Sequence, residues 1–140
     1  MRLVVDANVF VAAFMKNALT RELLLDERLE LATPEYGIIE TKNILGRPKI
    51  LSRLRLDREE FEALWSVLTA SVEVIARAEY QRFIKDARRL IDDPKDIPYL
   101  ACAMQLRSPI WSNDPDFQTP KVKSRAEILT TGELIERLRR

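Results

Sequence analysis

The chain alternates short runs of consecutive apolar residues with longer segments in which apolar residues recur every three or four positions. Short apolar runs are typical of strands that are buried on both faces. They lie at residues 3–5, 29–32, 72–75, 109–113 and 126–129. The first run, Leu3-Val-Val5, is too brief and too apolar for a surface element, so it predicts a buried central strand.

The segments between these runs have the spacing of amphipathic helices. They cover residues 9–15, 17–28, 33–45, 57–68, 79–91 and 131–138, the last with Thr131 as its cap. Residues 92–96 begin a further helix. Thr33 followed by Pro34 is a favourable helix start, with Thr33 as the cap. Asp57 with Glu60 three residues later predicts a capping box.

Strands separated by helices throughout the chain indicate an α/β fold. We expect three layers, in which a central, mainly parallel sheet is flanked by helices. Residues 1–140 contain no linker, internal repeat or low-complexity segment, and their length suits one domain with a sizeable core.

The composition predicts a globular protein, because 46% of the residues are apolar and 32% are charged. The 23 basic and 22 acidic residues nearly cancel, so any nucleic-acid site must come from local clustering. A single cysteine, Cys102, excludes an internal disulfide and fits a reducing compartment. With no apolar run near the length of a membrane span and no leader before the first strand, we expect a cytoplasmic protein without a membrane segment.

Histidine is absent. The sequence therefore lacks the usual general base and the commonest zinc ligand. Catalysis would have to depend on other side chains, such as carboxylates. Oxygen ligands alone favour hard cations such as magnesium or manganese.

Two acids, Asp6 and Asp114, directly follow predicted strands. Because the carboxyl ends of parallel strands lie at one edge of the sheet, these two side chains are candidates for neighbours. An ionised aspartate buried there needs a cationic or hydrogen-bonding partner. Taken singly, each acid is explained as well or better as the cap of the next helix or turn.

Two further acids have ordinary explanations of their own. Glu40 lies in mid-helix with Tyr36 and Gly37 on its face, where a solvated glutamate is an equal alternative. Asp96 lies in a first helical turn, three residues after Asp93, as capping would require. Three or four acids brought together would repel one another and raise their pKa values unless a divalent ion neutralised them. Such a cluster suits two-metal phosphodiester hydrolysis.

Four motifs in this order resemble the PIN domain family, in particular the small single-domain VapC-type toxins of prokaryotes. They are residues 4–9 (Val-Val-Asp-Ala-Asn-Val), 38–42 (Ile-Ile-Glu-Thr-Lys), 96–103 (Asp-Ile-Pro-Tyr-Leu-Ala-Cys-Ala) and 111–117 (Trp-Ser-Asn-Asp-Pro-Asp-Phe). The likeness extends over essentially the whole chain, because the order of helices and strands also fits. No motif is specific alone, whereas the four together are.

The resemblance implies roles for particular residues. Asp6, Glu40, Asp96 and Asp114 would form a catalytic acidic pocket that holds Mg²⁺ or Mn²⁺, with Asp116 as an auxiliary metal ligand, while Asn8 and Ser112 would brace the pocket by hydrogen bonds. Asp92 and Asp93 are close enough to Asp96 to compete for the third position. The Tyr-Leu-Ala run after Asp96 favours Asp96.

The implied activity is that of a metal-dependent endoribonuclease, the toxin of a VapBC-type pair. Such proteins are commonly homodimers, each inhibited by a small antitoxin protein. Basic residues must then surround the acidic pocket to bind the RNA substrate. The candidates are Lys42, Arg47, Lys49, Arg53 and Arg55, with Arg58 beside them and a C-terminal group of Lys121, Lys123, Arg125, Arg137, Arg139 and Arg140. A solvated basic face is an equal alternative.

Other interpretations stay open at this point. A housekeeping RNA-processing or DNA-acting nuclease would share the same acids, and an inactive PIN fold could serve as an RNA- or protein-binding module, although such a module would be expected to lose at least one acid. A phosphoacceptor receiver domain would need a lysine after a late strand, which is not evident. Phe61, Trp65 and Leu68 share a helical face that fits the core better than an interface, and Cys102 and Met104 fit core packing.

Overall fold

The computed structural model describes residues 1–140 and contains one five-stranded sheet. The strands are β1 (Arg2–Val5), β2 (Glu30–Pro34), β3 (Val72–Ile75), β4 (Ile110–Trp111) and β5 (Ile128–Leu129). All neighbouring pairs are parallel, and the strand order is β3-β2-β1-β4-β5. The predicted central parallel sheet is confirmed, with β1 at its centre.

Ten helices and two 3₁₀ turns connect the strands. They are α1 (Ala7–Phe14), α2 (Ala18–Leu24), α3 (Glu35–Leu45), α4 (Pro48–Leu54), α5 (Arg58–Thr69), α6 (Arg77–Tyr80), η1 (Gln81–Phe83), α7 (Ile84–Leu90), α8 (Ile97–Leu106), η2 (Pro115–Phe117), α9 (Pro120–Lys123) and α10 (Thr131–Leu138). The segment 79–91, expected as one helix, is divided among α6, η1 and α7. None of the helices combines the length and hydropathy needed to cross a bilayer.

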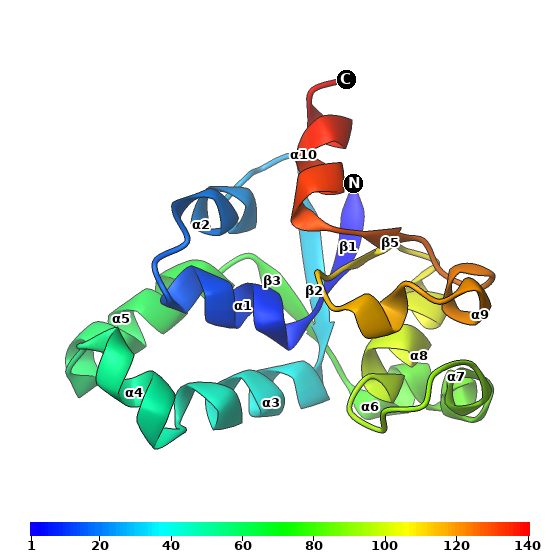
Figure 1. The fold of residues 1–140 in the computed structure, drawn as a ribbon, viewed down its shortest axis with the longest axis horizontal. Helices are drawn as coiled ribbons and strands as arrows, with labels where there is room; N and C mark the ends of the chain where they lie inside the picture. Colours follow the sequence, from blue (N-terminus) through cyan, green and yellow to red (C-terminus); the bar gives the residue numbers. More distant parts are fainter.

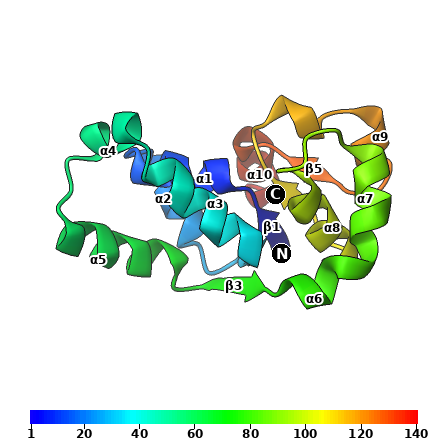
Figure 2. The ribbon, with the colours of Figure 1, turned by 90° about the horizontal axis from the view of Figure 1, so that it is seen from below.

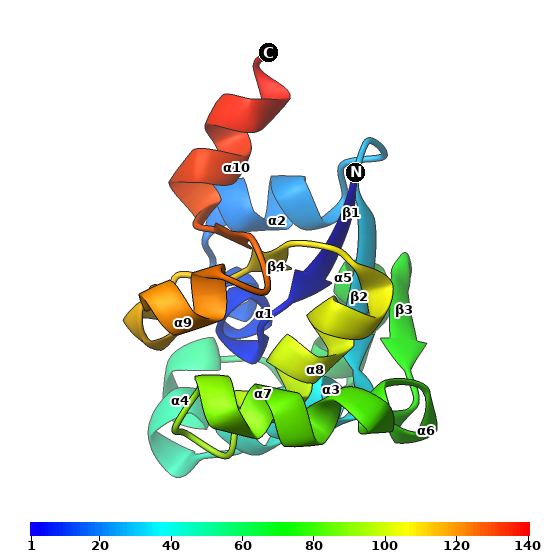
Figure 3. The same cartoon turned by 90° about the vertical axis from the view of Figure 1, so that its right-hand side faces the viewer.

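Helices cover both faces of the sheet, as the alternation of side chains along β1 requires. Val4 belongs to one buried cluster, which contains residues of α6, α7 and α8, whereas Leu3 and Val5 belong to a second, which contains residues of α1, α2, α5 and α10. In Figure 1 the strands run between α1, α2 and α5 on the left and α6, α7 and α8 on the right. Figure 3 shows α7 and α8 on the near face of the sheet. The three-layer prediction is confirmed.

Two of the predicted helix caps are wrong, and each has a tertiary cause. Thr33 lies in β2, and its hydroxyl donates to the carbonyl of Val5 at 3.0 Å, so it links two strands instead of capping α3. Pro34 takes the cap position of α3. Thr130 caps α10, one residue earlier than expected, while Thr131 accepts from the indole of Trp111. The capping box of Asp57 and Glu60 is present as predicted.

The aromatic face of α5 packs inward. The rings of Phe61 and Trp65 pack at a tilt against the ring of Phe14 in α1, with their centroids 5.1 and 5.9 Å from its centroid, and Leu68 is buried. Cys102 and Met104 are also buried, and burial raises the pKa of the Cys102 thiol to about 12. These residues stabilise the core, and the thiol is unreactive at neutral pH.

The strand order reverses between β1 and β4. From β1 the chain proceeds through β2 to β3 on one side of the sheet, and β4 and β5 lie on the other. At such a switch point the connections leave in opposite directions, which opens a crevice at the carboxyl ends of the two strands. The residues that follow β1 and β4 therefore face each other there.

Candidate functional site

Asp6 and Asp114 meet at this switch point and share one serine. The hydroxyl of Ser112 donates to Oδ2 of Asp6 at 2.7 Å and accepts from the backbone N–H of Asp114 at 3.0 Å. Asp6 and Ser112 are buried, with exposed fractions of 3% and 0%, and Asp114 is half-buried. Asp114 also caps η2, accepting from the N–H of Asp116 at 2.9 Å. Asp6 occupies the cap position of α1 but makes no capping hydrogen bond, so its carboxylate is directed to Ser112 instead.

Glu40 reaches the same region from α3. It is half-buried, and its Oε1 accepts a hydrogen bond of 2.6 Å from the phenol of Tyr99 on α8. Its Oε2 lies 3.5 Å from the hydroxyl of Tyr36, one turn earlier on α3. Glu40 also raises the pKa of Asp6, which places the two carboxylates within electrostatic reach. The solvated alternative for Glu40 therefore does not hold.

Asp96 has no such partner. It is only 6% exposed, and its Oδ2 is buried without any hydrogen bond. It occupies the cap position of α8, but its side chain accepts no capping hydrogen bond. The neighbouring carboxylate of Asp93, by contrast, accepts a hydrogen bond of 3.0 Å from the backbone N–H of Lys95. Because native structures rarely bury a polar atom unpaired, this oxygen requires an explanation such as a bound ion.

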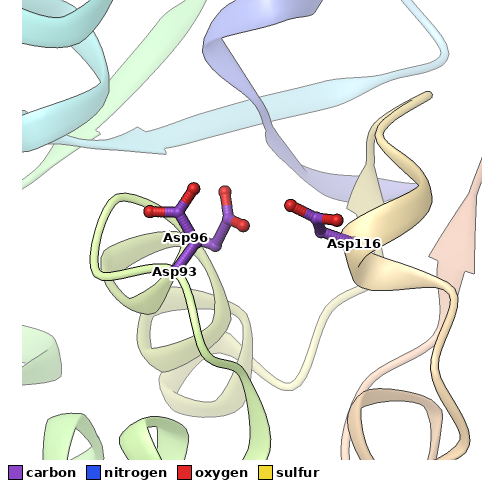
Figure 4. Close-up of side chains that lie close together, drawn as sticks. All are labelled: Asp93, Asp96 and Asp116. Atoms are coloured by element: carbon purple, nitrogen blue, oxygen red, sulfur yellow. The ribbon is translucent and has the colours of Figure 1, made fainter.

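Asp93, Asp96 and Asp116 each offer one carboxylate oxygen within 4.8 Å of the others. Figure 4 shows Asp93 and Asp96 side by side at the start of α8, with Asp116 facing them from the segment after β4. Asp93 and Asp116 are exposed, and Asp92 is exposed as well. Of the three acids that compete for the third position, Asp96 is the buried one, and Asp93 lies beside it as an additional oxygen donor.

Burial and mutual repulsion raise the pKa values of two of these acids. The pKa of Asp6 rises from 3.8 to about 6, mainly through burial, with smaller contributions from Glu40 and Asp114, against a lowering by the Ser112 bond. The pKa of Asp96 rises to about 8, again mainly through burial and then through Asp114, Asp93, Asp6 and Asp116. The six acids are therefore coupled electrostatically, with Glu40 acting through Asp6, whereas only Asp93, Asp96 and Asp116 have oxygens all within 4.8 Å of one another.

The donor set suits a hard divalent cation. It consists of carboxylates only, and none of the four ion pairs in the structure involves these acids. An uncompensated cluster of this kind is unfavourable without a proton or a cation. The unpartnered buried oxygen of Asp96, beside two exposed carboxylates, fits a magnesium or manganese ion.

Asn8 and most of the basic candidates do not contact the acid cluster. Asn8 is exposed on α1 and makes no hydrogen bond to the acids, in contrast to Ser112. The basic residues expected to bind RNA are exposed and outside all ion pairs: Lys42, Arg47, Lys49, Arg53 and Arg55. Figures 1 and 2 show α4 at the far end of α3 from α8, so most of this group is offset from the acid cluster.

One basic residue of the C-terminal group lies close to the acids. Lys121 lines a hollow of about 790 Å³ together with Asp92, Asp93 and Asp116. By contrast, Arg137 and Arg139 form ion pairs with Glu127 and Glu136. Of the predicted basic residues, Lys121 therefore lies beside the acids, those of α4 lie at a distance, and Arg137 and Arg139 are paired with other acids.

No sequence pattern assigned Tyr99 a contact with Glu40, and Asp93 was expected only as a competitor of Asp96 for the third position. Tyr99 lies three residues after Asp96 on α8, and Tyr36 lies four residues before Glu40 on α3. Helical spacing alone places each tyrosine on the same side of its helix as an acid. That spacing could have indicated a tyrosine pair at Glu40, whereas the contact between α3 and α8 is a tertiary feature.

The comparisons with known proteins agree with this architecture. The chain is similar in structure to a chain of the crystal structure of VapBC2 from Rickettsia felis bound to a DNA fragment from their promoter, with a TM-score of 0.68 and 16% sequence identity over 93% of this chain and 98% of the other. At that identity, the likeness concerns the fold alone. The sequence matches none of the curated proteins with which it was compared. The family model of the PIN domain matches residues 4–137. The chain therefore belongs to the PIN domain family.

Proposed function

We propose that this protein is a Mg²⁺- or Mn²⁺-dependent endoribonuclease of the VapC type, which hydrolyses phosphodiester bonds of RNA. The observation that supports this function most is the carboxylate of Asp96, which is buried without a partner inside a cluster of acids at the switch point of a parallel sheet. Membership of the PIN domain family supports nuclease chemistry.

Asp6, Glu40, Asp96 and Asp114 would hold the metal, with Asp116 and Asp93 as outer ligands. A divalent ion at this place supplies Lewis acidity, lowering the pKa of an attacking water and stabilising the leaving oxygen. The chain itself contributes the arrangement of the acids. Ser112 holds Asp6 and the Asp114 backbone in one geometry, and burial of Asp6 and Asp96 keeps bulk water away from their carboxylates.

Substrate RNA would approach over the exposed side of the cluster. Lys121 is placed to neutralise a phosphate beside Asp93 and Asp116, and the basic residues of α4 would bind the strand further away. Such contacts make affinity depend on salt concentration. In this arrangement the acids position the cation and the lysine positions the RNA backbone.

The biological role we infer is that of a cytoplasmic toxin paired with a small antitoxin protein, in a homodimer. The similarity in fold to VapBC2, a complex bound to promoter DNA, supports this assignment. Complete retention of the four motif acids argues against an inactive binding module. A housekeeping nuclease would have the same site and would differ in its substrate and in the lack of an antitoxin.

The experiment that tests the activity is cleavage of a mixed RNA pool by purified protein in Mg²⁺, with Asp6→Asn beside the wild type. We expect cleavage that disappears in EDTA and in the variant. Asp92→Asn is the matched control, because Asp92 is exposed and does not belong to the group of acids whose oxygens approach one another, and it should keep the activity. Equal background from all proteins, in antitoxin-free samples that bind no metal, would instead favour a binding module.

A further inference from the structure

The carboxylate of Glu40 is held by a buried side chain from another helix. Tyr99 donates from its phenol to Oε1 of Glu40 at 2.6 Å, across 59 residues of sequence. Tyr36 lies on the other oxygen, at a longer distance of 3.5 Å, and is only half-buried. Of the two tyrosines, Tyr99 therefore makes the shorter and better shielded contact with this acid.

The ring of Tyr99 has little freedom to move. Its exposed fraction is 0%, and it belongs to the buried cluster around α8. Tyr99 packs edge-to-face against Tyr36, with the ring centroids 6.3 Å apart and the ring planes at 73° to each other. The phenol is protonated at neutral pH, so its hydroxyl acts as the donor to Glu40. A fixed ring with a permanent donor gives the hydrogen bond one direction.

A glycine on α3 allows this contact. Gly37 lies one helical turn before Glu40, and a Cβ placed there would lie 3.2 Å from Cε1 of Tyr99 and 3.4 Å from its hydroxyl. The same Cβ would collide with Oγ1 of Thr33. The missing side chain lets α3 approach Tyr99 closely enough for the phenol to reach Glu40.

We propose that Tyr99 is a positioning residue that holds the carboxylate of Glu40 in one orientation toward the other acids, before a cation binds. The proposal rests on the proposed function, because it assigns Glu40 to the metal site. A free glutamate on a helix samples several rotamers, and ordering it on binding lowers affinity. The hydrogen bond from Tyr99 orders the Glu40 side chain when the protein folds, so that ordering does not oppose metal binding later. Hydrogen-bond partners of metal ligands commonly have this role.

The test measures Mn²⁺ binding to the purified protein by titration calorimetry. Tyr99→Phe keeps the ring and removes the hydroxyl, and it should weaken Mn²⁺ binding by roughly ten- to a hundredfold. Tyr80→Phe is the matched control, because Tyr80 is also buried in the same cluster and its hydroxyl bonds none of the acids. This control should bind Mn²⁺ as the wild type does.

A second background separates positioning from packing. In Glu40→Gln, the change Tyr99→Phe should have little further effect on Mn²⁺ affinity, since the hydroxyl acts through Glu40. An equal loss in both backgrounds would indicate a packing role and overturn the proposal.

The outcomes distinguish the two proposals. If Glu40→Gln weakens Mn²⁺ binding while folded Tyr99→Phe binds as the wild type does, the positioning role is wrong and the metal site stands. If the wild type binds no Mn²⁺, or Glu40→Gln binds it unchanged, the assignment of Glu40 to the metal site fails, and the positioning role fails with it.

Discussion

The two sides of the acid cluster differ in how the protein satisfies them. On one side, Asp6 and Glu40 receive hydrogen bonds from the buried hydroxyls of Ser112 and Tyr99. On the other, Asp96 is as buried as Asp6 but has an oxygen with no partner, next to the exposed carboxylates of Asp93 and Asp116. We call these the braced side and the open side. The fold therefore satisfies the carboxylates of the braced side itself, whereas those of the open side need a proton or a cation.

The largest effect is expected from removing the buried charge of the open side. Asp96→Asn should lower the rate of metal-dependent RNA cleavage by at least about a hundredfold, because it removes a ligand that no neighbour replaces. Initial rates at saturating Mg²⁺ measure this, with Asp92→Asn as the exposed control from the same loop. A variant that keeps most of the wild-type rate would place the chemistry on the braced side alone.

The pH dependence of stability should reveal the open side without any substrate. The pKa values of Asp6 and Asp96 are raised to about 6 and about 8 in the folded protein, so between pH 4 and pH 8 the native state binds more protons than the unfolded state. The metal-free protein should therefore lose stability as pH rises through this window. Urea unfolding in EDTA from pH 4 to pH 9 measures the loss.

Two controls belong with this measurement. Excess Mn²⁺ should flatten the pH dependence, because the cation replaces the protons on the acids. Asp96→Asn should reduce the slope more than Asp92→Asn does, since Asp96 has the larger shift and Asp92 is exposed. A slope of the opposite sign in metal-free protein would show that the two acids are not destabilised by their burial.

Breaking the braced side should have a smaller effect on stability. Ser112→Ala removes the hydrogen bond to Asp6 and the acceptor for the Asp114 N–H, and leaves a buried carboxylate oxygen unpaired. We expect a loss of about 1–3 kcal/mol in the free energy of unfolding at pH 8, together with a further rise in the pKa of Asp6. Ser108→Ala is the control, because Ser108 bonds only the carbonyl of Leu106. Equal losses in the two variants would argue against a special role for Ser112.

The smallest effect is expected at the rim of the open side. Lys121→Ala should weaken RNA binding and reduce the slope of log affinity against log salt by about 0.7, the value for one phosphate contact with a single strand. Lys49→Ala on α4 tests the distant basic group in the same assay. Binding measured with a catalytically inactive Asp6→Asn background avoids cleavage during the titration. An unchanged salt slope in Lys121→Ala would exclude this lysine from the RNA contact.

Local patterns predicted most of the elements because strands and amphipathic helices reflect spacing within one segment. They failed at the proline signals. Two short helices that begin with a proline were not predicted: Pro48 is the first residue of α4, and Pro120 begins α9 after the capping residue Thr119. Both helices are short, with little periodicity to detect. The segment 79–91 was predicted as one helix because the helical spacing of its apolar residues continues across η1, where the structure interrupts the helix.

Patterns within single segments were enough to predict the five strands and their parallel sheet, and with them the placement of Asp6 and Asp114 at one edge of that sheet. Which acid has a hydrogen-bond partner depends on the three-dimensional arrangement. The bond from Ser112 to Asp6 spans 106 residues and that from Tyr99 to Glu40 spans 59, so neither is visible in a local pattern. Burial also depends on distant segments, and it distinguishes Asp96 from its exposed neighbours Asp92 and Asp93. Hydrogen bonding and desolvation depend on what surrounds a side chain in space, and for these acids the surroundings come from distant segments of the chain.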